Sequence, residues 1–138
     1  MEEVILVKIE SIEKCIKRIE EKLSFENFDM EDYDTQDIVV LNLQRACQQS
    51  IDLAMFLVAE LEIGVPKDSV GAFKLLKNEK IIDEKTFKSM KGMVGFRNIA
   101  VHQYQKIDYT IVEIVINKHL EDFRNYNKML IDKLITST

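Results

Sequence analysis

Helix-breaking residues are almost absent from this chain. Its 138 residues include one proline and four glycines, far below ordinary usage. A β-sandwich or barrel needs many tight turns, and such turns depend on these two residue types. The scarcity of both nearly excludes an all-β fold and, with many Ile, Leu, Lys and Glu residues, favours a few long helices. The length predicts a single domain over residues 1–138.

The spacing of apolar residues predicts where the helices lie. Over residues 2–23 they recur at alternating steps of four and three, which is the apolar seam of an amphipathic helix. The seam consists of Ile5, Ile9, Ile12, Ile16, Ile19 and Leu23. A second helix starts near Asp34 or Thr35, either of which can cap it, and continues to about Glu62 before Gly64 ends it.

Three further helices complete the predicted fold. A short one covers about residues 69–78, a fourth covers about 84–101, and the last runs from residue 108 or 110 to about 135 with Ile111 and Ile114 among its apolar positions. The predicted architecture is therefore all-α, an up-and-down bundle of four long helices plus one short helix.

Charge is unevenly distributed along the chain. The net charge is −5, yet residues 72–106 hold eight basic and three acidic residues, or +5, which leaves −10 for the rest. This asymmetry predicts a local positive field on an acidic body, as a binding patch for nucleic acid would need. The alternative is a solvated, lysine-rich helix face.

No targeting, membrane or metal-binding signal is visible. Cys15 and Cys47 each sit in an apolar helical pattern, which predicts buried thiols in a reducing cytoplasm. The sequence has no C-x-x-C pair and no His/Cys cluster, so neither a zinc site nor a cofactor is expected. An acidic N-terminus and the lack of any 18-residue apolar run argue against export and membrane spanning.

Residues 92–104 differ from ordinary bundle sequence. Gly92 and Gly95 fall inside a helical pattern, where each costs about 1 kcal/mol relative to alanine. A close approach by another backbone usually compensates such a cost, so these glycines predict a tight contact.

Arg97, Asn98, His102 and Tyr104 follow these glycines closely. Asn98 and His102 share a helix face, whereas Arg97 and His102 converge better if the helix ends near Val101 and His102 turns back. Such a set suits metal-free phosphodiester cleavage, in which a histidine moves the proton of a 2′-hydroxyl and an arginine stabilises phosphate charge. The alternative is a helix-capping histidine beside an arginine in a surface ion pair.

Three other polar residues are considered for roles outside the motif. Asp37 and Asp52, on the second helix, are candidates to orient Arg97 by pairing with it. His119 is interpreted as a structural or surface residue of the last helix.

The segment from Arg97 to Tyr104, RNIAVHQY, resembles the R-x4-H-x-Y motif of the HepT toxins in the HEPN superfamily. The wider superfamily motif is R-x4-6-H with a polar residue favoured after the arginine, a position that Asn98 fills. The similarity extends over nearly the whole chain, including the helix order and residues 41–45 and 61–66.

This resemblance implies a cytoplasmic, helical ribonuclease that cuts mRNA or tRNA without a metal. Arg97 and His102 would be catalytic and Asn98 supporting. Two copies would form a homodimer in which both motifs face one cleft. The implied partner is an MntA-type minimal nucleotidyltransferase, the antitoxin, which would neutralise the toxin by transferring AMP to Tyr104.

Two other interpretations remain open from the sequence. A HEPN fold also serves as a non-catalytic scaffold or nucleotide-binding subunit of a nucleotidyltransferase complex. A plain dimeric helical adaptor would use the seam from Ile5 to Leu23 as its interface, but it leaves the glycine-flanked motif unexplained.

Overall fold

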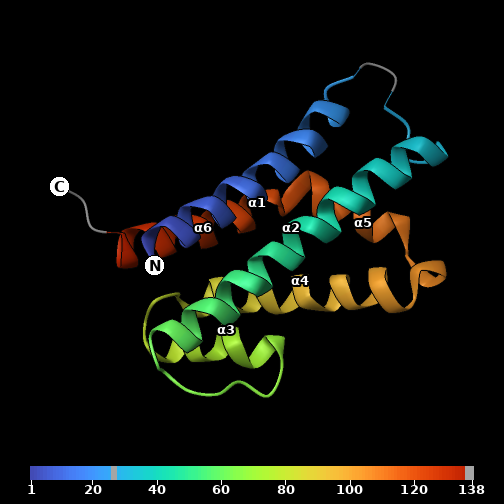
Figure 1. The fold of residues 1–138 in the computed structure, drawn as a ribbon. Helices are drawn as coiled ribbons and strands as arrows, with labels where there is room; N and C mark the ends of the chain where they lie inside the picture. Colours follow the sequence, from blue (N-terminus) through green and yellow to red (C-terminus); the bar gives the residue numbers. More distant parts are fainter. Residues whose placement is uncertain (26–27, 136–138) are drawn as a thin grey trace.

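A computed structural model describes residues 1–25 and 28–135, and every regular element in these ranges is helical (Figure 1). The elements are α1 (Glu2–Leu23), α2 (Tyr33–Glu60), α3 (Ser69–Asn78), α4 (Glu84–His102), the 3₁₀ helix η1 (Tyr104–Lys106), α5 (Tyr109–Lys118) and α6 (Leu120–Leu134). The prediction of an all-α fold is confirmed. None of the helices described here is long and apolar enough to cross a membrane.

Aspartates start four of the helices. The carboxylates of Asp32, Asp68, Asp83 and Asp108 each accept a hydrogen bond from a backbone N–H two or three residues further on, at 2.7–2.9 Å. Each carboxylate satisfies a donor that the first helical turn leaves unpaired. The cap of α2 is therefore Asp32, not Asp34 or Thr35 as predicted, because Thr35 is itself the donor to Asp32.

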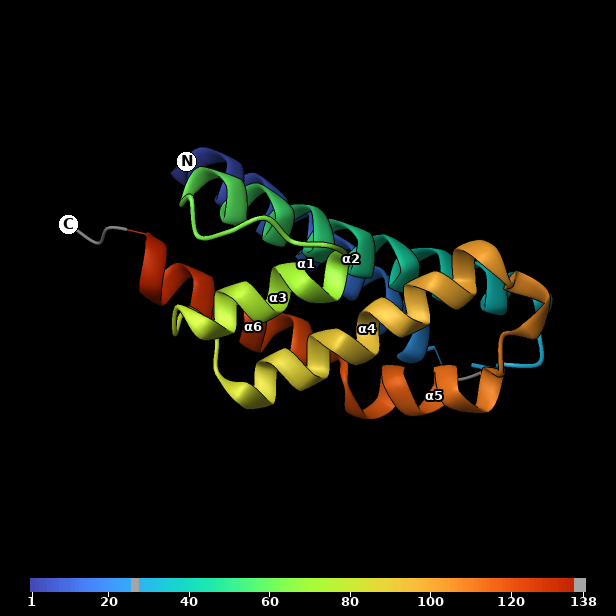
Figure 2. The ribbon, with the colours of Figure 1, turned by 90° about the horizontal axis from the view of Figure 1, so that it is seen from below.

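The longest helix, α2, lies at the centre of the fold. It packs against α1, α3 and α4, while α6 contacts α1 and α4, and α5 contacts α6. Figures 1 and 2 place the start of α1 and the end of α6 at one end of the bundle. The start of α2 and the turn from α4 to α5 lie at the other end, which brings the predicted motif close to α2.

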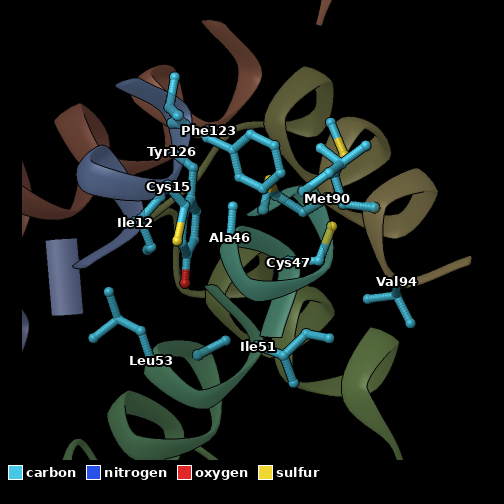
Figure 3. Packing of buried hydrophobic residues seen from close by; sticks show 14 of the residues in the cluster. Ile12, Cys15, Ala46, Cys47, Ile51, Leu53, Met90, Val94, Phe123 and Tyr126 are labelled. Carbon is cyan, nitrogen blue, oxygen red and sulfur yellow. The ribbon is translucent and has the colours of Figure 1, made fainter. Parts of the chain in front are cut away.

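The core buries the apolar seam of α1. Ile5, Ile12, Ile16 and Ile19 have no exposed surface, and Figure 3 shows side chains from α1, α2, α4 and α6 meeting in this core. Since the seam is used inside the chain, it is not free to be the interface that the adaptor interpretation required.

Both cysteines are buried free thiols, as predicted. Burial raises the pKa of Cys15, and more strongly that of Cys47. A thiol that stays protonated is a poor nucleophile, so these residues contribute packing and not reactivity.

The predicted last helix is interrupted at His119, which separates α5 from α6. The backbone of His119 leaves the helical region, with φ −124° and ψ 2°, and its Nδ1 lies 3.0 Å from a carboxylate oxygen of Asp122. This local pair helps hold the residue outside the helix. Ile111 and Ile114 on α5 are exposed, although the periodicity placed them in the core.

Candidate functional site

The predicted motif lies at the carboxyl end of α4. The helix ends at His102, one residue after the predicted end near Val101. His102 is therefore still helical and does not turn back toward Arg97. Asn98 and His102 share a face, as predicted for residues four apart. Arg97 and His102 point about 140° apart around the helix, so the helix alone does not bring them together.

Arg97 points inward from α4. Its side chain is half-buried, and Nη2 donates a hydrogen bond to Oγ of Ser69, the first residue of α3, at 3.2 Å. Its Nε is buried and has no hydrogen-bond partner. The charge of Arg97 is also felt by the buried Cys47 thiol on α2, where it opposes the rise in pKa caused by burial. The guanidinium is therefore held from one side and keeps an unused donor.

Neither predicted aspartate pairs with Arg97. Asp52 accepts a hydrogen bond from Nε2 of Gln48 at 2.8 Å, and Asp37 accepts one from Tyr104 at 3.1 Å. The residue that does position Arg97, Ser69, was interpreted only as the start of a helix. No spacing rule links two residues 28 positions apart, so the sequence held no signal for this contact.

His102 and Tyr104 lie at the surface. His102 is exposed at the end of α4, and Tyr104 begins η1 with 44% of its surface accessible. The Tyr104 hydroxyl donates to Oδ1 of Asp37, near the start of α2. Burial, together with its interactions with Tyr109 and Asp37, raises the pKa of Tyr104 to about 12. The phenol is therefore neutral at physiological pH, but its hydroxyl is within reach of another protein.

The two motif glycines face open space. An added Cβ at Gly92 or Gly95 would meet no atom within 4 Å, so the predicted close backbone contact is not formed within the chain. Instead, both glycines line a groove of about 590 Å³ between α4 and α5. Its apolar lining consists of Met93, Phe96, Ile99, Ile111 and Val115.

Exposed lysines are frequent in the segment that contains the motif. The positive segment predicted from the sequence folds into α3, α4 and η1, and α3 packs directly against α4. Within it, Lys77 is paired with Glu84 at 3.0 Å. The exposed lysines of the segment are Lys74, Lys80, Lys85, Lys88, Lys91 and Lys106. Neighbouring helices thus present a concentration of positive charge on an acidic molecule.

No group of three or more His, Cys, Asp or Glu side chains in the described ranges is arranged to hold a metal ion. The imidazole of His102 is a group that can transfer protons near neutral pH, and the guanidinium of Arg97 is one that can stabilise negative charge.

Comparison with known proteins decides the family. The model of the family described as "Ribonuclease HepT-like" matches residues 10–130. The chain belongs to this family. The resemblance seen in the sequence is thereby confirmed, and so is the prediction of a ribonuclease at the level of the family.

HepT-like relatives cover most of the chain. An "mRNA nuclease HepT" from Shewanella oneidensis is 40% identical over 126 residues, which is 91% of this chain and 95% of the relative. A "tRNA nuclease HepT" from Aphanizomenon flos-aquae is 29% identical over 116 residues, 81% of this chain and 79% of the relative.

A solved structure shows the same fold. The tri-AMPylated HEPN toxin of S. oneidensis in complex with MNT antitoxin superposes with a TM-score of 0.89, at 38% identity over 96% of this chain and 100% of that one. The HepT-like fold predicted from the motif and the helix order is therefore the fold observed.

Proposed function

We propose that the chain is a toxin ribonuclease that cleaves RNA without a metal ion, using Arg97 and His102. The observation that carries this proposal is the complete R-x4-H-x-Y set, on the exposed end of α4, in a chain 40% identical to an mRNA nuclease HepT. The lysines of α3, α4 and η1 supply the sequence-independent attraction for RNA phosphates. Messenger RNA is the favoured substrate, because the relative named a tRNA nuclease is only 29% identical.

The chemistry divides between the two catalytic residues. His102 takes the proton of a ribose 2′-hydroxyl, and an imidazole is suited to this near neutral pH. The 2′-oxygen then attacks the adjacent phosphorus, the bond from phosphorus to the 5′-oxygen of the next nucleotide breaks, and that oxygen takes up a proton and leaves as a hydroxyl, so that a 2′,3′-cyclic phosphate remains. Arg97 stabilises the negative charge that develops on the phosphate oxygens. Arg97 makes no ion pair with a carboxylate in the part of the chain that the structure describes, so its charge is available to a phosphate. Asn98, on the face of His102, supports substrate binding.

A homodimer would complete the site. Arg97 and His102 diverge around α4, and the glycine-lined groove beside them is apolar and open. Exposed glycines in a helix are otherwise costly, and a second copy packed on this groove would use them for close backbone approach. Two motifs would then face a common cleft, with each chain contributing charge to it.

Regulation would act through Tyr104. The related toxin is AMPylated and bound by an MNT antitoxin, so a cognate MntA-type nucleotidyltransferase is the expected partner here. AMP attached to Tyr104 would add bulk and negative charge close to the motif, and so compete with RNA phosphate.

The nuclease proposal is tested by RNA cleavage with purified protein in excess EDTA. Cleavage should persist in the chelator and fall by about 10²–10⁴ in His102→Ala and in Arg97→Ala. Arg18→Ala is the matched control, because Arg18 is an exposed arginine on α1, remote in sequence from the motif. Loss of cleavage in EDTA, or full activity of His102→Ala, would show that the mechanism is wrong.

The scaffold interpretation makes the opposite prediction. A non-catalytic subunit needs neither Arg97 nor His102, so purified protein would not cut RNA at all, and both substitutions would leave its complex with the nucleotidyltransferase intact.

A further inference from the structure

The acceptor hydroxyl of Tyr104 already has a carboxylate beside it. Tyr104 Oη donates to Asp37 Oδ1 at 3.1 Å, and the two residues are 67 positions apart. Asp37 is exposed on the first turns of α2 and makes no ion pair within the described part of the chain. The hydroxyl and the carboxylate are both at the surface, where a second enzyme reaches them together.

A neutral phenol is a weak nucleophile. With its pKa raised to about 12, only about one Tyr104 in 10⁵ is ionised at pH 7. Transfer of a nucleotidyl group to this oxygen therefore needs a base that removes the proton as the new bond forms. A base must lie about 2.6–3.2 Å from the oxygen that carries that proton, and Asp37 meets this condition before any partner binds.

We propose that Asp37 is the general base for AMPylation of this chain, so that the toxin supplies a catalytic residue for its own modification. The inference rests on the proposed function, in which Tyr104 is the acceptor. Tyr104 Oη attacks the α-phosphorus of ATP and its proton passes to Asp37 Oδ1. The bond between the α-phosphorus and the oxygen bridging to the β-phosphate breaks, and pyrophosphate leaves. The products are O-AMP-tyrosine, pyrophosphate and one proton, which exposed Asp37 returns to solvent.

The test compares two conservative substitutions on α2. Asp37→Asn keeps an oxygen that accepts the Tyr104 hydrogen bond but cannot take up the proton. Asp34→Asn is the matched control, because it makes the same chemical change on an exposed residue one turn earlier in the same helix. Each protein is incubated with the cognate nucleotidyltransferase and ATP, and AMP on the Tyr104 peptide is followed by mass spectrometry. Thermal melting checks that each variant folds.

Asp37→Asn should lower the initial rate of AMP transfer by about 10²–10⁴ at pH 7, while Asp34→Asn should match the unaltered chain. The deficit should shrink as pH rises, because ionisation of Tyr104 in solution replaces the missing base. The nucleotidyltransferase has a pH response of its own, which affects all variants equally. We remove it by dividing the AMP-transfer rate of each variant by that of Asp34→Asn at the same pH.

Two results would overturn the role of Asp37 alone. One is an unchanged rate in Asp37→Asn, which would place the base in the partner. The other is a deficit that is the same at every pH, since that indicates a contribution to binding and not to proton transfer. Absence of AMP from Tyr104 in the unaltered chain is a distinct result, and would overturn both this inference and the regulatory part of the proposed function.

Discussion

Arg97 has one guanidinium nitrogen that donates a hydrogen bond and another that is buried without an acceptor. Its Nη2 is held by Ser69, whereas its Nε is buried without a partner. Buried donors are almost always satisfied in folded proteins, because an unpaired one costs about 1–3 kcal/mol. Because this nitrogen has no accessible surface, an anionic ligand would supply the missing acceptor only after a shift of the Arg97 side chain.

Removal of the Tyr104 hydroxyl should abolish inhibition by AMP transfer while RNA cleavage is retained. Tyr104→Phe deletes the acceptor oxygen and the hydrogen bond to Asp37 but leaves Arg97 and His102 in place. We expect this variant to cut RNA and to stay toxic when the nucleotidyltransferase is co-expressed, while the unaltered chain is neutralised. Cell growth and intact mass, measured with and without the partner, check this.

Transfer of AMP to a different residue would contradict the assignment. Tyr109 is the obvious alternative because it interacts with the Tyr104 hydroxyl. If Tyr104→Phe carried AMP on Tyr109 and lost its toxicity, Tyr104 would not be the switch, although the nuclease assignment would survive.

At the scale of single residues, the sequence predicted which positions on α4 share a face but not what holds the side chains in place. A spacing of four put Asn98 and His102 on one face, whereas only the resemblance to the R-x4-H-x-Y motif joined Arg97 to them. The partners that orient the site, Ser69 and Asp37, lie 28 and 67 positions from the residues they touch. Such contacts depend on how helices cross, which no local pattern contains.

At the scale of helices, caps and periodicity predicted most boundaries. The bounds of α1 and α3, and the start of α4 after Asp83, are as expected. The break at His119 was missed because it involves neither proline nor glycine. At this break His119 pairs with Asp122, and α6 beyond it packs against α1 and α4.

The end of α2 differs from the prediction that Gly64 terminates it, and α3 ends in a similar way. Each ends with a residue in the left-handed region, Glu62 at φ 53° and Lys80 at φ 60°. After α3, the N–H groups of Lys80 and Ile81 return to the carbonyls of Lys77 and Leu76 at 2.9 and 3.0 Å. This is the helix-ending geometry that usually carries glycine.

Lys80→Gly should therefore stabilise the fold by about 0.5–1 kcal/mol, because glycine adopts this backbone conformation without the steric cost that a lysine carries. Lys74→Gly is the matched control. It makes the same change inside α3, where it should destabilise by about 1 kcal/mol. Denaturant unfolding of both variants measures the two values, and a destabilised Lys80→Gly would contradict the interpretation.

At the scale of the whole molecule, a substitution in the groove between α4 and α5 can test dimerisation without disturbing the folding of a single chain. Gly95 has open space above it, so Gly95→Glu is tolerated within a chain but would place a charge against the apolar surface of a second copy. We expect Gly95→Glu to be monomeric and folded, and the unaltered protein to be a dimer at micromolar concentration.

Light scattering coupled to size-exclusion chromatography checks this expectation. Asn125→Glu, which adds the same charge to an exposed site on α6, should remain a dimer. A monomeric mass for the unaltered protein would rule out the proposed assembly.

The chain termini and the R-x4-H-x-Y motif lie at opposite ends of the bundle. The start of α1 and the end of α6 lie at one end, and the turn after α4 lies at the other (Figures 1 and 2). A surface anchor or fluorescent protein joined at either terminus would hold the molecule with the end that carries the R-x4-H-x-Y motif facing outward. Tethered in this way, single molecules would meet RNA and the modifying enzyme without obstruction from the attachment, so cleavage and its silencing could be timed on the same molecule.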